Sequence, residues 1–387
     1  MDYISLSDIA SYKQGKQIPV DKQSSTCEDG MVRFVRIVDF TNPSEPPRYI
    51  ENPGTQYAVD KKDIVMIRYG SQTAGTVVRG IPGIIANNMF QIHINDSRFD
   101  TNYMYYYLTS SAVKQMLMGG QSSSTMPAIT FGMLKQVQVP VRPLEDQKKI
   151  ANFLGEIDKK IEINKRINDN LQQQAQAVYQ NWFVEYAPFG GVAPLDWNAG
   201  RLKDILKLHK RSTKPGADPN LPYLPIDMIP MRTFSVIDFR PNKEAQSSLI
   251  KFRKDDIVIG AMRVYFHRVI PAPCDGITRT TCFILKPVDP SYLSYALLTC
   301  DLDSSIAHAQ KTSKGSTMPY AVWDGGMGEI ELEIPSEAVA KEFNEIILPL
   351  LRLIQQNCSE IRSLQAIRDA LLPKLMSGEI DVSDIQL

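Results

Sequence analysis

The chain has 387 residues, which is more than a single hydrophobic core usually organises, so we expect two or more domains. Its composition, 43% hydrophobic and 22% charged residues, excludes a disordered chain. The 43 Lys and Arg residues balance 43 Asp and Glu residues, which excludes nucleic-acid binding by net charge alone but not a local basic surface.

No stretch of the sequence is apolar for long enough to cross a membrane, and the first residues lack the basic start and apolar run of a leader peptide. The five cysteines and four histidines are scattered and form no zinc-binding pattern. We therefore expect a cytoplasmic protein with reduced thiols and no metal ion.

Five short signatures follow one another through the first half of the chain. They are Leu6-Ser7-Asp8-Ile9, the strand-like Asp63-Ile64-Val65, the helix-like segment from Tyr103 to Leu108, the turn Ser124-Thr125-Met126-Pro127 and the strand Val137-Gln138-Val139-Pro140. A helical pattern then begins at Pro143, with Glu145 and Asp146 in its first turn, where negative charge suits the helix dipole.

This first helix carries apolar and asparagine residues at alternating steps of four and three, which is a heptad seam. The seam consists of Ile150, Leu154, Ile157, Ile161, Asn164, Asn168, Leu171, Ala175, Val178 and Trp182. Its length exceeds that of a typical helix in a globular core, so we expect a coiled-coil partner.

All five signatures return in the second half, about 190 residues later and in the same order. They recur as Leu202-Lys203-Asp204-Ile205, Asp256-Ile257-Val258, the segment from Tyr292 to Leu297, Ser316-Thr317-Met318-Pro319 and Leu332-Glu333-Ile334-Pro335. Such repetition indicates a duplicated domain. The intervening loops diverge, as residues 69–75 and 261–267 illustrate, and this is typical of two binding domains with different targets.

A second long helix closes the chain, with Ser336 as its expected N-cap and Gly378 at its end. Its seam consists of Phe343, Ile347, Leu350, Ile354, Asn357, Ile361, Leu364, Arg368, Leu371 and Leu375. Pro349 removes a backbone donor and should kink the helix. Arg368 occupies a seam position, and we expect it to lie at a frayed end or to meet a partner protein.

Both seams carry asparagine near the middle, a residue that fixes the register of paired helices. We therefore predict that the two helices pair with each other, and in antiparallel fashion because each follows its own globular domain. The pairing residues are Ile157, Ile161, Asn164, Asn168, Leu171, Ile347, Leu350, Ile354, Asn357, Ile361 and Leu364. The alternative is two ordinary amphipathic helices that pack into a core.

The sequence thus predicts a fold of the α/β (α+β) class, with duplicated domains joined by two long antiparallel coiled-coil helices. We expect the first domain at residues 1–142, the first helix at 143–190, the second domain at 191–335 and the second helix at 336–387.

Two segments resemble conserved regions of one known family. The stretch Pro143-Leu144-Glu145-Asp146-Gln147-Lys148-Lys149-Ile150-Ala151, continuing to Tyr179-Gln180-Asn181-Trp182-Phe183, is similar to the central region of the specificity subunits of type I restriction-modification enzymes. The segment Leu371-Leu372-Pro373-Lys374-Leu375-Met376-Ser377-Gly378-Glu379-Ile380 resembles their distal region. The second helix matches the motif at its start only loosely, as Pro335-Ser336-Glu337-Ala338-Val339.

This resemblance implies a DNA-recognition subunit with no catalytic residues and no cofactor of its own. Each recognition domain would read half of a split site in double-stranded DNA, and the helices would set the spacer between the half-sites and dock methyltransferase (modification) subunits. A motor-nuclease (restriction) subunit would join for cleavage, and no membrane partner is implied.

Signatures of an enzyme are missing from the sequence. The only Pro-Pro pair, Pro46-Pro47, lacks the Asn or Asp and the aromatic residue of an adenine methyltransferase, and no phosphate-binding loop occurs. Asp255 and Asp256 beside Lys254 are a weak nuclease candidate, more typical of a turn. The alternative to a DNA reader is a helical scaffold or adaptor protein without DNA binding.

Base reading requires exposed side chains with paired donors and acceptors, such as Arg, Asn and Gln, and basic loops bind phosphates. The candidate DNA contacts are Arg68, Ser71, Gln72, Asn87, Asn88, Lys207, Lys210, Arg211, Arg263, His267, Arg268, Arg279, Thr280, Lys311 and Lys314. An ordinary surface role is the alternative for each of them.

Overall fold

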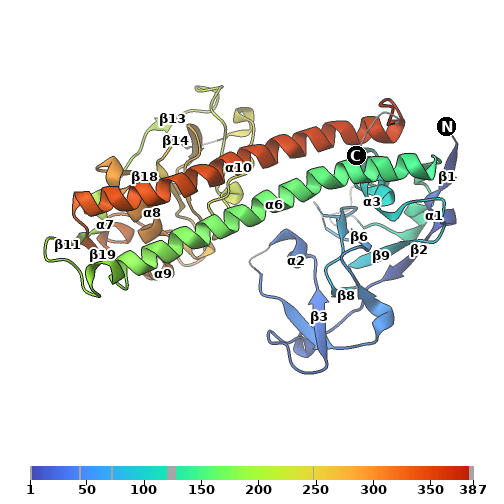
Figure 1. The fold of residues 1–387 in the computed structure, drawn as a ribbon, viewed down its shortest axis with the longest axis horizontal. Helices are drawn as coiled ribbons and strands as arrows, with labels where there is room; N and C mark the ends of the chain where they lie inside the picture. Colours follow the sequence, from blue (N-terminus) through green and yellow to red (C-terminus); the bar gives the residue numbers. More distant parts are fainter. Residues whose placement is uncertain (1, 43–44, 71–72, 120–127, 247, 383–387) are drawn as a thin grey trace. The chain divides into compact units, whose positions relative to one another are not determined.

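The computed structural model describes residues 2–42, 45–70, 73–119, 128–246 and 248–382 (Figure 1). They form two compact units: unit 1 comprises residues 1–159 and 365–387, and unit 2 comprises residues 160–364. Both long helices, α6 (Leu144–Phe183) and α10 (Glu337–Ser377), therefore contribute a segment to each unit. The four predicted domains separate helices from globular parts, and their boundaries stay a prediction.

Unit 1 contains two four-stranded sheets and a two-stranded pair. The main sheet has the order β2-β9-β6-β7 and is antiparallel, whereas the second sheet, β4-β3-β8-β5, includes the parallel pair β3 and β8. The strands are β1 (Tyr3–Ser5), β2 (Ala10–Gln14), β3 (Met31–Val35), β4 (Arg48–Glu51), β5 (Ala58–Val59), β6 (Ile64–Ile67), β7 (Val77–Arg79), β8 (Gly83–Ile85), β9 (Met89–Ile94) and β10 (Gln138–Pro140).

Short helices accompany these sheets: α1 (Leu6–Ile9), α2 (Val38–Thr41), α3 (Thr101–Thr109), α4 (Ser111–Gly119) and α5 (Phe131–Leu134). Helix α3 begins at an N-cap, Asp100, whose carboxylate accepts from the backbone N–H groups of Asn102 and Tyr103. Strand β6 is an uninterrupted apolar run that is buried along its whole length, as expected for a strand covered on both faces.

Unit 2 repeats the main sheet, with the order β12-β18-β15-β16, again antiparallel. A three-stranded sheet, β13-β14-β17, and the pair β11-β19 complete it. The strands are β11 (Asn198–Arg201), β12 (Leu206–Leu208), β13 (Ser212–Thr213), β14 (Leu249–Phe252), β15 (Ile257–Gly260), β16 (Val269–Pro271), β17 (Gly276–Arg279), β18 (Cys282–Pro287) and β19 (Glu331–Ile334). The helices are α7 (Leu202–Ile205), α8 (Leu293–Cys300) and α9 (Asp303–Lys311).

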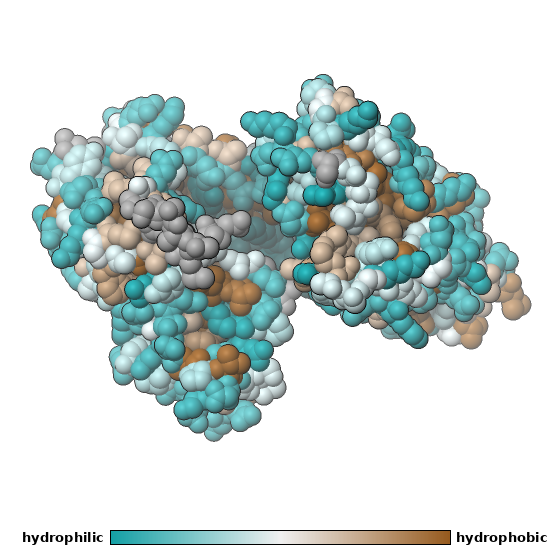
Figure 2. All heavy atoms as spheres, turned by 180° about the vertical axis from the view of Figure 1, so that it is seen from behind, coloured by the Kyte–Doolittle hydropathy of each residue, from teal (hydrophilic) through white to brown (hydrophobic). Residues whose placement is uncertain are grey.

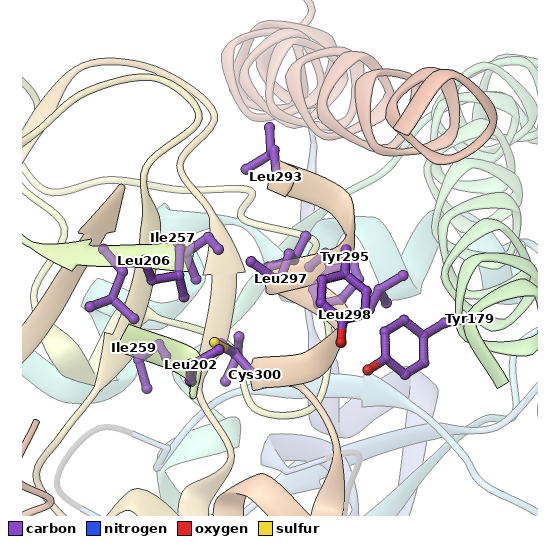
Figure 3. Close-up of a cluster of buried hydrophobic side chains, with 14 of the residues drawn as sticks. Tyr179, Leu202, Leu206, Ile257, Ile259, Leu293, Tyr295, Leu297, Leu298 and Cys300 are labelled. Carbon is purple, nitrogen blue, oxygen red and sulfur yellow. The ribbon is translucent and has the colours of Figure 1, made fainter. Parts of the chain in front are cut away.

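The core of unit 2 joins the sheet, α8 and the end of α6. Figure 3 shows Tyr179 of α6 beside Tyr295 and Leu298 of α8, and the Tyr179 and Tyr295 rings stack at 5.8 Å between centroids. The hydroxyl group of Tyr179 lies 2.9 Å from that of Thr299, so the polar end of this buried ring is satisfied. The helix is thereby fixed to the globular part of its own unit.

The duplication predicted from the sequence is visible in the strand order, because β12-β18-β15-β16 matches β2-β9-β6-β7 element by element. Each main sheet is preceded by a one-turn helix, α1 or α7, and followed by a helix pair, α3–α4 or α8–α9. The second sheets differ, with four strands in one unit and three in the other. The predicted fold class of duplicated mixed domains with two long antiparallel helices is confirmed.

Helices α6 and α10 lie side by side and antiparallel within each unit (Figure 1). Helix α10 continues without a break through Pro349, which is exposed, and it ends before Gly378, whose φ of 82° fits a glycine C-cap. The expectation for Arg368 was wrong. Its guanidinium group donates to Asp158 of α6 at 2.8 Å, and the Tyr106 hydroxyl donates to the same carboxylate.

Among the helices in the described ranges, none is long and apolar enough to cross a membrane.

Candidate nucleic-acid interface

Unit 2 has a groove of about 640 Å³ that gathers three of the predicted DNA contacts, Lys210, Thr280 and Lys314. Apolar residues form much of the lining, including Phe283 and Trp323, whose rings meet edge to face. The full lining is Leu208, His209, Lys210, Ser212, Ile250, Ala261, Met262, Thr280, Thr281, Cys282, Phe283, Lys314, Tyr320, Ala321, Val322, Trp323 and Asp324. Such a lining suits a nucleic acid. The cationic and hydroxyl groups can bind its phosphates, and the apolar residues can contact the flat faces of its bases.

One wall of the groove is a turn closed by main-chain hydrogen bonds. Lys314 and Tyr320 donate to each other's carbonyl oxygens at 2.9 Å and thereby close the recurring Ser316–Pro319 turn into a loop. Gly315 adopts a φ of 87°, which only glycine tolerates easily. The side chains of Lys314 and Tyr320 are exposed, so the turn is rigid in its backbone and open in its side chains.

Burial and charged neighbours shift the pKa values of two side chains at the rim of the groove, His209 and Asp256. Burial, and then the nearby Arg211 guanidinium, lower the pKa of His209, so the imidazole is neutral at pH 7. Burial raises the pKa of Asp256, whose carboxylate lies 3.9 Å from the Arg211 guanidinium. Arg211 is half-buried and part of its charge is balanced by Asp256, which leaves Lys210 as the exposed cation at this rim.

The loop between β15 and β16 adjoins the groove. Met262 pairs with Tyr320 in an isolated bridge, and the Arg263 backbone N–H donates to the Pro319 carbonyl at 2.7 Å. Arg263 is exposed and adopts a φ of 50°. This predicted contact residue therefore stands on the surface, next to the turn that carries Lys314.

Two predicted DNA contacts in the same loop, His267 and Arg268, bind other residues of the protein with their side chains. His267 is 3% exposed, and its Nε2 atom lies 2.8 Å from the Asp301 carboxylate. The Arg268 guanidinium donates to the carbonyl oxygens of Ile226 and Ile229. Both side chains hold the loop through contacts inside the protein, which argues against direct base contacts by them.

The remaining candidates of unit 2 lie on exposed positions outside the groove lining. Lys207 stands on β12, Arg279 at the end of β17, and Lys311 at the end of α9. Their side chains are free to meet phosphates, but the groove does not bring them together with Lys210 and Lys314.

In unit 1, Arg68 follows β6 and its guanidinium donates to the Ile129 carbonyl at 3.2 Å. Asn87 donates to Gln17, and the Asn88 side-chain oxygen is buried without a hydrogen-bond partner. The predicted contacts Ser71 and Gln72, and the turn from Ser124 to Pro127, lie outside the described residues. Arg68, Asn87 and Asn88 are half-buried rather than fully exposed.

The two units fasten the loop after their central strand in the same way. Tyr69, just beyond β6, bridges to Ala128, and Met262, just beyond β15, bridges to Tyr320. In both cases the bridging partner follows the recurring Ser-Thr-Met-Pro sequence. Met262, Tyr320 and Trp323 are not among the contacts predicted from the sequence, although the position of Tyr320 and Trp323 just after the recurring turn was a usable signal.

Figure 2 shows a largely hydrophilic face on which apolar side chains appear in small groups. Some exposed apolar residues lie on the long helices within unit 2. Ile163 and Ile167 of α6 are 42% and 39% exposed, and Ile346 and Leu353 of α10 are 42% and 40% exposed. These four residues are here called the outer apolar set. Ile163 and Ile167 are four residues apart and Ile346 and Leu353 seven apart, so each pair lies along one face of its own helix.

The predicted pairing residues come together on the inner side of these helices. Asn164 donates to Glu360 at 2.8 Å, Asn357 donates to Asn168 at 2.8 Å, and Asn168 donates to the Cys358 sulfur at 3.4 Å. The fully buried pairing residues are Ile161, Asn164, Asn168, Leu171, Ile347, Ile354, Asn357 and Ile361. Ile157, Leu350 and Leu364 are half-buried, and Leu351 rather than Leu350 takes the fully buried position.

Residues 1–173 match the family described as the type I restriction modification DNA specificity domain. The chain is 26% identical over 316 residues to the type I restriction enzyme MjaIX specificity subunit of Methanocaldococcus jannaschii, covering 74% of this chain and 70% of that protein. It is 20% identical over 415 residues to the MjaVIII specificity subunit of the same organism, covering 99% and 94%.

Among solved structures, the S subunit of a type I restriction-modification system from M. genitalium has a similar fold. The TM-score is 0.57 at 17% sequence identity, and the match covers 97% of this chain and 95% of the other. A match at this identity concerns the fold, and it extends over both duplicated halves.

Proposed function

We propose that this chain is a specificity subunit of a type I restriction-modification system and that it selects the DNA sequence on which the system acts. The family match over residues 1–173 and the similarity to two such subunits support this proposal. Its recognition domains, at residues 1–142 and 191–335, each read one half of a bipartite site in double-stranded DNA. The helices at 143–190 and 336–387 set the spacer between these half-sites.

The observation that carries this proposal is the repeated main sheet with unlike loops. Two sheets of the same strand order support two readers, and the divergent loops fastened beside each sheet support two different half-sites. In unit 2 the contacts are proposed from the groove, with Lys210, Thr280 and Lys314, and from Arg263 beside it. A helical scaffold without DNA binding does not account for this arrangement.

Partner subunits supply the chemistry in this proposal. Methyltransferase subunits, which carry S-adenosylmethionine, dock on the outer faces of the helices, and a motor-nuclease subunit joins the complex in the cytoplasm for cleavage. The outer apolar set supports the docking step, because exposed apolar residues at helical spacing are typical of a helix face that meets another protein. The chain itself is non-catalytic.

A DNA-binding experiment on the assembled complex tests the proposal. The complex with its methyltransferase subunits is expected to bind one bipartite sequence at least about a thousandfold more tightly than unrelated DNA. Methylome sequencing of the host with and without the gene identifies that sequence. Equal affinity for all duplexes, or an unchanged methylome, would exclude the proposal.

The spacer function has its own test. Seven residues inserted into each helix, in register, lengthen the pair by about 10.5 Å, because an α-helix rises 1.5 Å per residue. That length corresponds to about three base pairs of a DNA turn of about 34 Å. The methylated site is expected to keep both half-sites and to gain unread base pairs between them. An unchanged spacer in a stable, active variant would contradict the ruler.

A further inference from the structure

The loop between β15 and β16 carries two adjacent aromatic residues at its tip, and both are exposed to solvent. Tyr265 and Phe266 are 42% and 36% exposed, and their ring centroids lie 5.0 Å apart. They belong to the one-turn 3-10 helix η6 (Val264–Phe266) at the tip of the hairpin. Exposed aromatic rings leave a large apolar area in contact with water, so a ligand that covers them would gain binding free energy.

The tip is held rigidly from below. Arg263 and His267 flank η6, and both adopt left-handed backbone angles, with φ values of 50° and 51°. Residues other than glycine keep such angles only where their surroundings impose them, and strain of this kind clusters at ligand-binding sites. Here the buried His267 side chain contacts Asp301, and the His267 carbonyl accepts from the Arg232 backbone at 2.8 Å.

Arg268 completes this support. Its guanidinium group donates to the carbonyl oxygens of Ile226 and Ile229, and it lies 5.4 Å from the centre of the Phe266 ring. Val264, between the two strained residues, is 2% exposed and anchors η6 in the core. The backbone that carries the aromatic pair is therefore held in place, so less conformational entropy is lost when a ligand covers the two rings.

Exposed cations lie beside the tip and suit a polyanion, while the Asp303 carboxylate, 3.3 Å from His267 Nδ1, is paired with Arg232 at 2.9 Å. The exposed Arg263 is at the base of the pair, and its backbone bond to Pro319 joins the hairpin to the turn that carries the exposed Lys314. Aromatic rings beside such cations are suited to nucleic acid, whose phosphates meet the cations while the bases stack on the rings. The loop of unit 1 in the same place, residues 69–75, contains no such aromatic pair.

We propose that Tyr265 and Phe266 form a stacking wedge that inserts at a base step of the DNA bound by the second recognition domain. Insertion of apolar side chains between base pairs partly unstacks them and kinks the duplex, which makes binding sensitive to how easily that step deforms. The wedge rests on the proposed DNA-reading function and adds a contribution to specificity that needs no hydrogen bond to a base.

The test uses the full complex with methyltransferase subunits and duplexes with 2-aminopurine at successive positions of the second half-site. Binding of the wild-type complex is expected to raise 2-aminopurine fluorescence at one step. The double variant Tyr265→Ala/Phe266→Ala should lose that signal and bind about 10- to 100-fold more weakly. Tyr265→Phe/Phe266→Tyr keeps both rings and should retain the signal, and Val288→Ala, at a side chain 51% exposed, is the matched control.

Each other outcome has a definite meaning. If the wild-type complex binds DNA specifically but the alanine variant keeps both signal and affinity, the wedge is wrong and the DNA-reading function stands. If the alanine variant binds its methyltransferase subunits more weakly, the aromatic pair is a protein contact, which also overturns the wedge. A wild-type complex with no specific DNA binding overturns the proposed function itself.

Discussion

The Asn357 side-chain amide donates to the Asn168 side-chain oxygen at 2.8 Å, between two helices that have a largely apolar seam. Both residues are buried, with exposures of 7% and 1%. A shift of either helix by one heptad would separate the two amides and leave both buried without this bond. The pair therefore selects one register of α6 against α10, which is the established use of buried asparagine in coiled coils.

Loss of either amide should destabilise unit 2. Asn168→Ala and Asn357→Ala are each expected to lower the free energy of unfolding by about 1–3 kcal/mol, because the remaining amide keeps its desolvation cost without its partner. The double variant should lose less than the sum of the two. Urea denaturation followed by circular dichroism measures these values. Asn170→Ala, at an exposed position of the same helix, is the control, and strictly additive losses would contradict the coupling.

The groove lysines should contribute affinity rather than sequence preference. Lys210→Ala and Lys314→Ala are each expected to weaken DNA binding uniformly across sequences and to reduce the slope of log affinity against log salt by about 1. Lys243→Ala, an exposed lysine of unit 2 outside the groove lining, serves as the control. Gel shifts at several salt concentrations test this. A variant that changes which bases are preferred, with the salt slope unaltered, would assign the lysine to base reading.

Stability should depend on pH through His209. Its pKa is lowered in the folded protein by burial and by Arg211, so its contribution is fully present above the unfolded-state pKa of about 6.5 and is lost as pH falls through the folded value. His209→Gln should remove this part of the pH dependence. The difference in unfolding free energy between wild type and variant, measured at pH 7.5 and 5.5, gives the contribution of His209 together with its interaction with Asp256. If this difference is the same at the two pH values, His209 does not contribute to the pH dependence of stability.

The outer apolar set should matter for assembly and not for folding. Ile163→Glu/Ile167→Glu is expected to weaken binding of methyltransferase subunits about tenfold or more, because a docked interface would bury two unpaired charges. Val192→Glu places the same charge on an exposed apolar residue outside both helices and is the control. Analytical ultracentrifugation of the mixed subunits measures assembly. Normal assembly by the double variant would show that the methyltransferase subunits bind a different surface.

Local patterns in the sequence were sufficient to predict the duplicated sheets and the paired helices. A heptad period and a short signature can each be recognised from residues that are close in the sequence. The predicted helix pairing agrees with the hydrogen bonds that Asn164 and Asn357 donate across the two helices. The roles of individual loop residues were less accessible. His267 is one of the predicted DNA contacts, and the buried pairing of its side chain with Asp301, 34 positions away in the chain, could not be derived from spacing.

Arg368 illustrates the same limit on the helices. A charged residue at a seam position suggested fraying or a partner protein, whereas Asp158 on the opposing helix and Tyr106 on α3 form a polar cluster around it. The three residues are far apart in the chain, and only the folded arrangement brings the arginine to its carboxylate.

The bridges from Tyr69 to Ala128 and from Met262 to Tyr320 are made by backbone atoms. Backbone bonds tolerate many side chains, so mutations in these loops can accumulate without loosening the sheets beneath them. A lineage under pressure to recognise new sites can thus alter its preference in small steps, and one half can diverge while the other keeps its inherited target.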